Sequence, residues 1–280
     1  LYDRFVNQGA VMGDSFGLEN VLWFANNKED AHEEPTIKRS RSHDYVSKEV
    51  INVRENVGLI EVANFSKHEF KGPDARKFLD HIMAGRLPKP GRISLSPMLS
   101  YRGKLCGDLT VACLDENEFM VFGSGAAQEM HRRWFESHLD KFNLSYSNRS
   151  DEYHGLSIAG PNSRKVLEKI VRDDVSNEKF KFRDSRRMFV GGVPAIINRI
   201  SFTGELGYEI YVAPHFQLKL YEELMEAGKE FNIKPFGGRA LMSMRLEKNW
   251  GAWTLDYRPD FTAKETGLDA FINWDKEFIG

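Results

Sequence analysis

The amino-acid sequence predicts an α+β fold made of two related, ferredoxin-like units, each an antiparallel sheet with helices on one face. Two observations favour this fold. First, residues 70–79 (FKGPDARKFL) resemble residues 158–167 (IAGPNSRKVL), so that Gly72 and Gly160 stand 88 residues apart in the same motif. Second, each copy is followed by strand patterns and then by a helix pattern, in the same order. An internal repeat is the simplest explanation.

Each copy of the motif is a junction between a strand and a helix. An apolar strand end meets Gly-Pro, and Asp74 or Asn162 follows at the position where a helix N-cap belongs. After the first copy we expect strands over 92–98, 107–114 and 119–123 and a helix over 127–141. After the second copy we expect strands over 193–202 and 208–212 and a helix over 216–231. The repeats therefore cover about 46–145 and 150–250.

Residues 46–255 are predicted to form the main domain, which opens with a helix over 49–57 and a strand over 58–62. Residues 1–45 are polar and irregular, which is typical of a linker or a wrapping segment. Residues 256–280 are expected to begin a further domain that is truncated. The chain opens on Leu1 rather than Met and stops directly after a globular stretch, so we expect both ends to be cut.

Composition excludes several classes of protein. With 280 residues, 41% of them hydrophobic, the chain can bury a large core. A net charge of −2 gives no electrostatic case for a nucleic-acid or membrane partner, and no apolar run reaches the length of about 18 residues that a membrane span needs. Cys106 and Cys113 form no CxxC and have no histidine cluster, so we expect free thiols and no metal site.

Asp108 is the first candidate for chemistry, because it follows turn glycines at the start of a strand. A carboxylate there either faces a cleft or caps the turn. Ser124 and Gly125 lie in a glycine-rich turn between a strand and a helix, but Gln128 stands where a dinucleotide-binding fingerprint has its third glycine. This turn instead favours the close approach of a flat ligand to the backbone.

Glu205 and Glu209 lie four residues apart around Gly207, at the start of a strand. Alternation puts Glu209 and Tyr211 on one face of that strand and three apolar or aromatic residues on the other. Glu209 then either faces solvent or accepts hydrogen bonds from the donor–donor edge of a ring such as a pterin.

A helix over 241–247 carries Arg245 and is followed by Trp250 and Trp253. The two tryptophans are either core anchors or a surface on which an aromatic ring stacks while Arg245 binds a carboxylate tail. The sequence pattern leaves both interpretations open.

Together these segments resemble the aminomethyltransferase (glycine-cleavage T-protein) family, and in particular the carboxy-terminal folate domain of dimethylglycine and sarcosine dehydrogenases. The resemblance covers essentially the whole chain, and its motifs are residues 1–5, 8–10, 62–67 (VANFSK), 87–92 (LPKPGR), 103–108 (GKLCGD), 202–211 (FTGELGYEIY) and 244–247 (MRLE). It implies the T-protein folate-binding fold, with a carboxy-terminal barrel that is truncated here.

The resemblance also implies a set of site residues. Asp108 is expected beside the reactive nitrogens of tetrahydrofolate, and Glu209 is expected to bind the pterin. The other residues expected at the cofactor are Glu205, Ser124, Gly125, Arg245, Trp253 and Tyr211. Phe202 replaces a tyrosine of many relatives, and Gly107 stands where T-proteins proper have a second acid, which argues against a stand-alone T-protein.

The implied reaction is an oxidative N-demethylation. An FAD domain outside this chain, amino-terminal to it in the same protein, oxidises an N-methyl group of dimethylglycine or sarcosine to an iminium. Its carbon then passes to tetrahydrofolate and gives 5,10-methylenetetrahydrofolate. Asp108 stabilises cationic intermediates and moves a proton, a role that needs a carboxylate ionised at neutral pH.

The resemblance implies a location in the bacterial cytoplasm or the mitochondrial matrix. Three alternatives stay open: a stand-alone aminomethyltransferase that works with a lipoyl carrier protein, a flavin-independent folate-dependent demethylase, and a non-enzymatic protein with this fold. Asp108 argues against the last of these.

Overall fold

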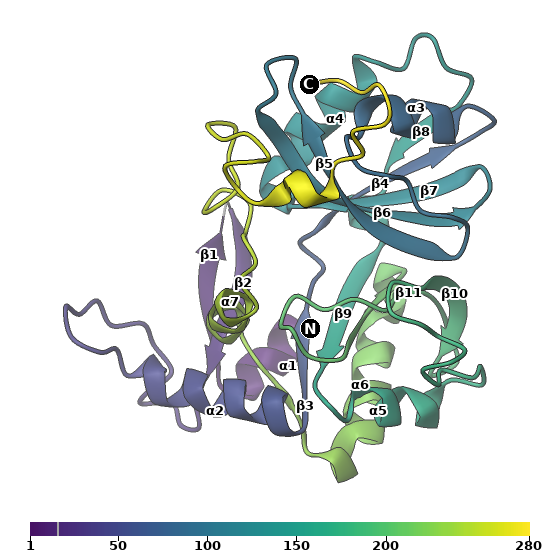
Figure 1. Ribbon diagram of the computed structural model, residues 1–280. Helices are drawn as coiled ribbons and strands as arrows, with labels where there is room; N and C mark the ends of the chain where they lie inside the picture. The colour runs from purple at the N-terminus through teal and green to yellow at the C-terminus, as the bar shows by residue number, and fades with distance from the viewer. Residues whose placement is uncertain (16) are drawn as a thin grey trace. The chain divides into compact units, whose positions relative to one another are not determined.

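The computed structural model describes residues 1–15 and 17–280, and the chain divides into two compact units, each with its own sheet (Figure 1). Unit 1 consists of residues 1–62, 154–182 and 188–250, and unit 2 consists of residues 63–153, 183–187 and 251–280. Each unit also has an apolar core of its own.

Unit 2 is built on a five-stranded sheet with the strand order β5-β6-β7-β4-β8, in which all neighbours are antiparallel. Its strands are β4 (Ser66–Lys71), β5 (Arg92–Leu99), β6 (Leu105–Asp115), β7 (Glu118–Gly123) and β8 (Ser145–Asn148). Helices α3 (Ala75–Ile82) and α4 (Gln128–Glu136) cover one face. Phe78 of α3 and Phe135 of α4 are fully buried there against Val111 of β6, in one apolar core.

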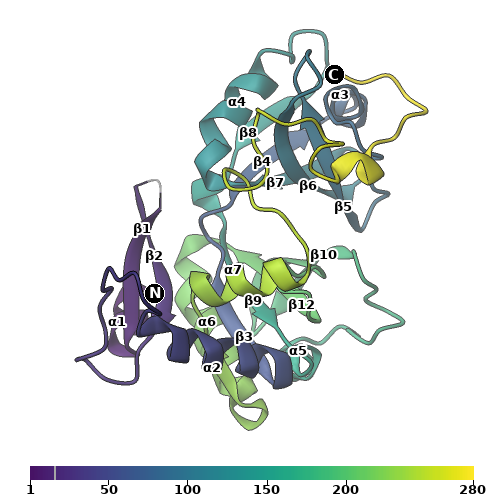
Figure 2. The ribbon, with the colours of Figure 1, turned by 60° about the vertical axis from the view of Figure 1, so that its left-hand side comes forward.

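Unit 1 contains a six-stranded sheet with the strand order β10-β11-β12-β9-β3-β13. The first residues of β10 are counted with unit 2. Its strands are β3 (Val57–Glu61), β9 (His154–Ala159), β10 (Ser185–Val190), β11 (Val193–Asn198), β12 (Gly207–Val212) and β13 (Ile233–Pro235). Its main helices are α2 (Ser42–Glu55), α5 (Ser163–Ile170), α6 (Gln217–Gly228) and α7 (Gly238–Glu247). Leu167 of α5 and Leu224 of α6 pack with Ile210 of β12 in its core, and Figure 2 shows these two helices beside the sheet.

The predicted repeat is confirmed, because both copies follow the same order of elements. The first runs β4-α3-β5-β6-β7, then the short 3₁₀ helix η1 (Gly125–Ala127), then α4-β8. The second runs β9-α5-β10-β11-β12, then the 3₁₀ helix η3 (Pro214–Phe216), then α6-β13. The strand orders also correspond, except that β3 is inserted between β9 and β13 in unit 1. Strands β8, β10 and β13 were not predicted.

The two Gly-Pro junctions have the same backbone geometry. Gly72 and Gly160 have φ angles of +135° and +133°, and each carbonyl accepts a hydrogen bond of 3.0 Å from the N–H three residues later. Asp74 and Asn162 stand at the helix N-caps as predicted, but neither side chain caps its helix. Asp74 instead accepts a hydrogen bond from the Asn143 N–H at 2.8 Å.

The prediction of an irregular segment over residues 1–45 is wrong for its first half. This half contains helix α1 (Tyr2–Asn7) and a hairpin of β1 (Ala10–Ser15) and β2 (Leu18–Phe24). Trp23 is fully buried against Tyr45, and the Glu49 carboxylate of α2 accepts hydrogen bonds from the N–H groups of Phe24 and Gly237 at 2.7 and 3.0 Å. These contacts join residues that are distant in sequence, so local pattern could not reveal them.

Two further segments differ from the predicted domain division. Residues 46–62 belong with the second repeat, because β3 pairs with β9 and β13. Residues 251–280 are counted with unit 2, and their one regular element is the 3₁₀ helix η5 (Leu268–Phe271). That they begin a further domain stays a prediction.

No helix in the described part of the chain is long and apolar enough to cross a membrane.

Candidate functional site

Asp108 lies within strand β6, where it pairs with Pro97 of β5. Leu109 and Val111 of β6 belong to the core beneath the helices, so alternation turns the Asp108 side chain to the opposite face of the sheet. The interpretation of Asp108 as a turn cap is therefore wrong.

The Asp108 carboxyl is half-buried and, in the described part of the chain, receives no hydrogen bond from another residue and forms no ion pair. Burial raises its pKa from 3.8 to about 7, and the backbone N–H of Asp108 itself offsets only part of this effect. Burial thus favours the protonated form of Asp108, whereas the expected role needs an ionised carboxylate. A pKa near 7 is the value at which a carboxyl group both accepts and donates protons efficiently.

Ser124 and Gly125 follow β7 and form the predicted tight turn, in which the Ser124 carbonyl accepts a hydrogen bond from the Ala127 N–H at 3.0 Å. A Cβ atom on Gly125 would lie 2.0 Å from the carbonyl oxygen of Asn64, so only glycine fits there. Strands β6 and β7 are antiparallel neighbours, and Thr110 of β6 pairs with Phe122 of β7, two residues before the turn.

Trp253 belongs to a compact loop of unit 2 and is half-buried. Its ring centroid lies 6.1 Å from that of His131 in α4. The loop is held by a hydrogen bond of 3.1 Å from the Gly251 N–H to the Tyr257 hydroxyl, and Thr254 next to Trp253 has a φ of +71°. A β-branched residue with positive φ is strained, which is common where a loop presents a functional side chain. Sequence reasoning missed His131.

In unit 1, Glu209 and Tyr211 share one face of β12 as predicted, opposite the core residues Tyr208, Ile210 and Val212. The Tyr211 hydroxyl donates a hydrogen bond of 2.9 Å to Glu209 Oε2. Glu209 is only 8% exposed, so burial raises its pKa to about 7 although the Tyr211 hydroxyl and the charge of Lys248 lower it. The pKa of Tyr211 lies well above its usual value, so the hydroxyl stays a donor.

Glu205 forms an ion pair with Arg54 of α2, and Arg54 also pairs with Glu247 of α7. The Glu205 carboxylate therefore already has a cationic partner. Arg245 of α7 is buried and donates a hydrogen bond of 2.9 Å to the carbonyl of Trp250. Arg245 thus fixes the chain that follows α7, and its contact with a cofactor stays a prediction.

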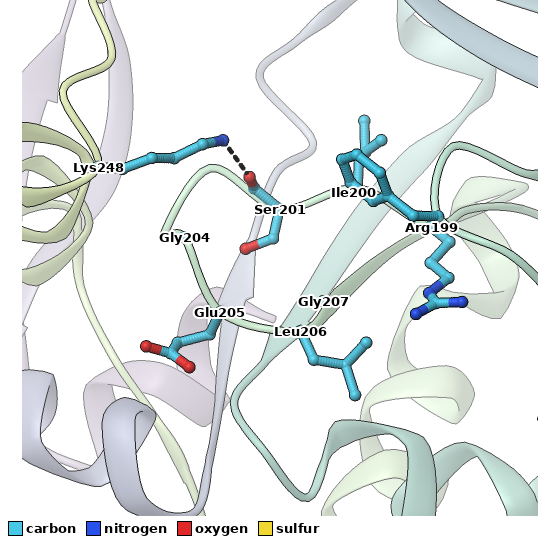
Figure 3. Close-up of a pocket in the computed structure, with 9 residues that line it drawn as sticks. Arg199, Ile200, Ser201, Gly204, Glu205, Leu206, Gly207 and Lys248 are labelled. Atoms are coloured by element: carbon cyan, nitrogen blue, oxygen red, sulfur yellow. Dashed lines mark hydrogen bonds between the residues drawn. The ribbon is translucent and has the colours of Figure 1, made fainter. Parts of the chain in front are cut away.

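A pocket of about 350 Å³ lies in unit 1 beside the loop before β12 (Figure 3). Its lining consists of Phe182, Arg199, Ile200, Ser201, Gly204, Glu205, Leu206, Gly207 and Lys248. Lys248, which follows α7, reaches the loop and donates a hydrogen bond of 2.8 Å to the Ser201 carbonyl, as Figure 3 shows. The charge of Lys248 also lowers the pKa of Glu209.

Within residues 1–15 and 17–280 no group of three or more His, Cys, Asp or Glu side chains could hold a metal ion. Cys106 and Cys113 are free thiols.

Residues 1–276 match the family model of the GCVT N-terminal domain. Mitochondrial dimethylglycine dehydrogenase of Homo sapiens is 35% identical over 285 residues, which cover 100% of this chain and 33% of that protein. Aminomethyltransferase of Thermoanaerobacter pseudethanolicus is 29% identical over 232 residues, which cover 81% of this chain and 62% of that protein. The chain thus spans about a third of the length of the dimethylglycine dehydrogenases that it matches.

Two solved structures share the fold. Glycine cleavage system aminomethyltransferase T from Bartonella henselae has a TM-score of 0.84 at 22% identity, and the match covers 100% of this chain and 71% of that one. Heterotetrameric sarcosine oxidase from Corynebacterium sp. U-96 has a TM-score of 0.51 at 19% identity, covering 70% of this chain and 97% of that one. The α+β fold with antiparallel sheets and the family resemblance are confirmed: the chain belongs to the GCVT N-terminal domain family, with both dimethylglycine dehydrogenases and aminomethyltransferases among its relatives.

Proposed function

We propose that this chain binds tetrahydrofolate and catalyses the transfer to it of the one-carbon unit of an iminium, formed elsewhere by two-electron oxidation of an N-methyl amine, giving 5,10-methylenetetrahydrofolate. The main support is Asp108, a carboxyl group without a protein partner in the described residues, whose burial brings its pKa to about 7. A group of this kind is costly for the fold and suited to proton transfer at neutral pH.

Glu209 fits the task of binding the pterin ring. Its only hydrogen-bond donor among the described side chains is the Tyr211 hydroxyl, which bonds to Oε2. A carboxylate accepts two parallel hydrogen bonds from the 2-amino group and ring N–H of a pterin, and these bonds favour its ionised form. Ligand binding would therefore lower the pKa of Glu209 below 7 and release a proton at neutral pH.

Asp108 is proposed to act on the reacting nitrogen and carbon atoms. In its ionised form it stabilises positive charge on the one-carbon donor, and in its protonated form it donates a proton to the departing amine. The Ser124–Gly125 turn would line the pterin, and Trp253 and Arg245 would contact the rest of the cofactor. Glu205, already paired with Arg54, would act mainly through the shape of the loop before β12.

The longer relatives suggest the setting of this reaction. Dimethylglycine dehydrogenases are about three times as long as the matching part. We therefore propose that an FAD domain in the same protein, amino-terminal to these residues, oxidises dimethylglycine, sarcosine or a similar amine. The protein would work in the bacterial cytoplasm or the mitochondrial matrix.

The test is to separate amine oxidation from one-carbon capture. In Asp108→Ala we expect dimethylglycine oxidation within about 2-fold of wild type, while the methylenetetrahydrofolate yield falls by about 10²-fold and free formaldehyde appears instead, as is typical for loss of an acid–base group. Asp115→Ala, at the exposed end of the same strand, is the matched control and should change neither quantity. An unchanged methylenetetrahydrofolate yield in Asp108→Ala would contradict the assignment. Wild-type binding of folinate, measured by calorimetry, tests the folate site directly.

A stand-alone aminomethyltransferase is the second candidate, because Aminomethyltransferase of Thermotoga sp. aligns with 100% of this chain at 27% identity. This activity would need an aminomethyl-loaded lipoyl carrier protein and no flavin. Methylenetetrahydrofolate formation from that carrier, with none from dimethylglycine and an electron acceptor, would favour this candidate. Demethylation of a sulfonium or methoxy compound without flavin would favour the flavin-independent folate-dependent demethylase.

A further inference from the structure

His131 of α4 lies in a niche that two strand glycines create. A Cβ atom on Gly107 of β6 would lie 2.9 Å from His131 Nε2, and one on Gly123 of β7 would lie 3.1 Å from His131 Nδ1. Neither glycine has a positive φ, so backbone conformation does not require glycine at these positions. Glycine in a strand interior weakens the strand and often marks the close approach of another group. Here that group is the imidazole of His131, whose side chain is buried.

The imidazole bonds to strand β6 at an irregular point of the sheet. Met98 of β5 pairs with Gly107, but Leu99 pairs with Leu105, so Cys106 is an extra residue without a partner on β5. The Cys106 carbonyl instead lies 3.0 Å from His131 Nε2, which donates to it. In the described part of the chain, Nδ1 has no hydrogen-bond partner, so the bond to Cys106 is the one that fixes the ring.

A β-bulge bends its strand and turns the side chains beside it, and bulges are frequent next to active sites for this reason. Asp108 is two residues from Cys106 on the same strand. The His131 ring also lies 6.1 Å from the ring of Trp253, another predicted site residue of unit 2. One buried side chain thus contacts the backbone of the bulge before Asp108 and the ring of Trp253.

We propose that His131 is a positioning residue for Asp108: its Nε2–H holds the bulge at Cys106 and thereby sets the place of the Asp108 carboxyl. This inference rests on the proposed function for its catalytic meaning, but the placement itself can be measured without any ligand. His68 of β4 offers a comparison, since it is equally buried and its ring lies 6.1 Å from that of His131, but it bonds to the Tyr146 hydroxyl at 2.9 Å and not to β6.

The experiment compares His131→Leu, His131→Gln and His68→Leu. Protein labelled with ¹³C at the aspartate carboxyl carbons is titrated by NMR, and the Asp108 signal is identified by its loss in Asp108→Asn. Wild type should titrate near pH 7. Because a loosened bulge admits water to the carboxyl, the Asp108 midpoint in His131→Leu should fall by about one unit or more. Glutamine keeps a donor near the Cys106 carbonyl, so His131→Gln should titrate as wild type, and so should His68→Leu.

The transfer assay then gives the catalytic readout. We expect one-carbon transfer in His131→Leu to fall by about 10²-fold, as is typical for a displacement of about 1 Å at a reacting group, with folinate affinity within about 3-fold of wild type. A one-carbon transfer rate in His131→Gln that lies between those of His131→Leu and wild type supports a positioning role. The inference is overturned if the Asp108 midpoint in His131→Leu equals that of wild type, or if His68→Leu shifts it equally. If the Asp108 midpoint shifts in His131→Leu but the wild-type protein makes no methylenetetrahydrofolate, the positioning role of His131 is supported. Only the proposed function is then contradicted.

Discussion

Glu209 illustrates how a single residue can oppose stability and serve a ligand. Its carboxyl is buried on β12, where it accepts a hydrogen bond from the Tyr211 hydroxyl, and its pKa is raised to about 7. The folded state therefore holds a proton between about pH 4.5 and 7 that the unfolded state has lost. Stability contributed by Glu209 is highest at low pH and decreases as the pH rises through this window.

Replacing Glu209 by glutamine should remove this cost while retaining the hydrogen bond from Tyr211. We expect Glu209→Gln to match wild type near pH 4.5 and to become more stable by up to about 3 kcal/mol at pH 8, since one pKa unit corresponds to about 1.4 kcal/mol. Denaturant unfolding at both pH values measures this difference.

The same variant should lose folate affinity, because the glutamine amide cannot accept two hydrogen bonds from the pterin edge. Glu19→Gln, at an exposed position of the same unit, is the control for a change of charge alone. A Glu209→Gln protein that is no more stable at pH 8 and binds folinate normally would refute both the burial cost and the pterin role.

Sequence pattern predicted some of these residues and missed others for a clear reason. Strand alternation alone put Glu209 and Tyr211 on one face, because side chains on a strand alternate with a period of two. The ion pair of Glu205 with Arg54 joins residues 151 positions apart, and no local rule connects them. His131 looked like an ordinary helix residue, although the glycines that admit it are visible in the sequence.

At the scale of elements, the two Gly-Pro junctions show why the repeat is recognisable. Gly72 and Gly160 have nearly identical positive φ angles, which L side chains rarely adopt. A Cβ atom on Gly160 would also lie 2.5 Å from the Asn56 carbonyl oxygen, and one on Gly72 would lie 2.9 Å from that of Asn143. The positive φ belongs to the strand–helix turn itself, and the backbone overlap comes from a segment distant in sequence that packs against each turn.

Gly160→Ala should destabilise the protein by about 3 kcal/mol or more, because it combines the strain of a positive φ with backbone overlap that cannot relax. Gly103→Ala is the matched control: Gly103 has a φ of +70°, but a Cβ atom there would have no neighbour within 4 Å, so the change should cost only about 1 kcal/mol. Midpoints of urea unfolding give the comparison. An equal loss of unfolding free energy in the two variants would show that the close backbone approach at Gly160 does not contribute to the cost of the substitution.

At the scale of the whole molecule, buried carboxyl groups and buried histidines have opposite effects on how stability depends on pH. Burial raises the pKa of Glu49, Asp108 and Glu209 to about 7, which makes stability fall as pH rises from about 4.5 to 7. Burial lowers the pKa of His68 to about 3 and that of His131 to about 4, which makes stability rise with pH up to about 6.5. Below about pH 4 the raised carboxyls are largely protonated in both states, and of these five groups only His68, with a pKa of about 3, still makes stability rise with pH.

His131 should therefore make stability fall as the pH drops from its unfolded pKa of 6.5 to its folded pKa of about 4. In His131→Gln, which keeps the donor but cannot take up a proton, the slope of unfolding free energy against pH should decrease by up to about 1.4 kcal/mol per pH unit in this range. Guanidinium unfolding between pH 4 and 6.5 measures it. A slope equal to that of wild type would mean that His131 is already charged in the folded protein.

The sequence by itself determined the class of fold, the repeat and the family, because these depend on local periods, on turn glycines and on ordered motifs. It also singled out Asp108 and Glu209 as chemically unusual. Only the tertiary structure decided that Tyr2–Asn7 form a helix and that Ala10–Ser15 pair with Leu18–Phe24. It also decided that residues 46–62 join the second repeat and that His131 reaches the bulge before Asp108. The physical reason is the same in each case. Local sequence patterns are compatible with several structures, and burial and hydrogen bonding between distant segments decide which of these forms. The same burial sets the pKa of the titratable side chains inside the protein.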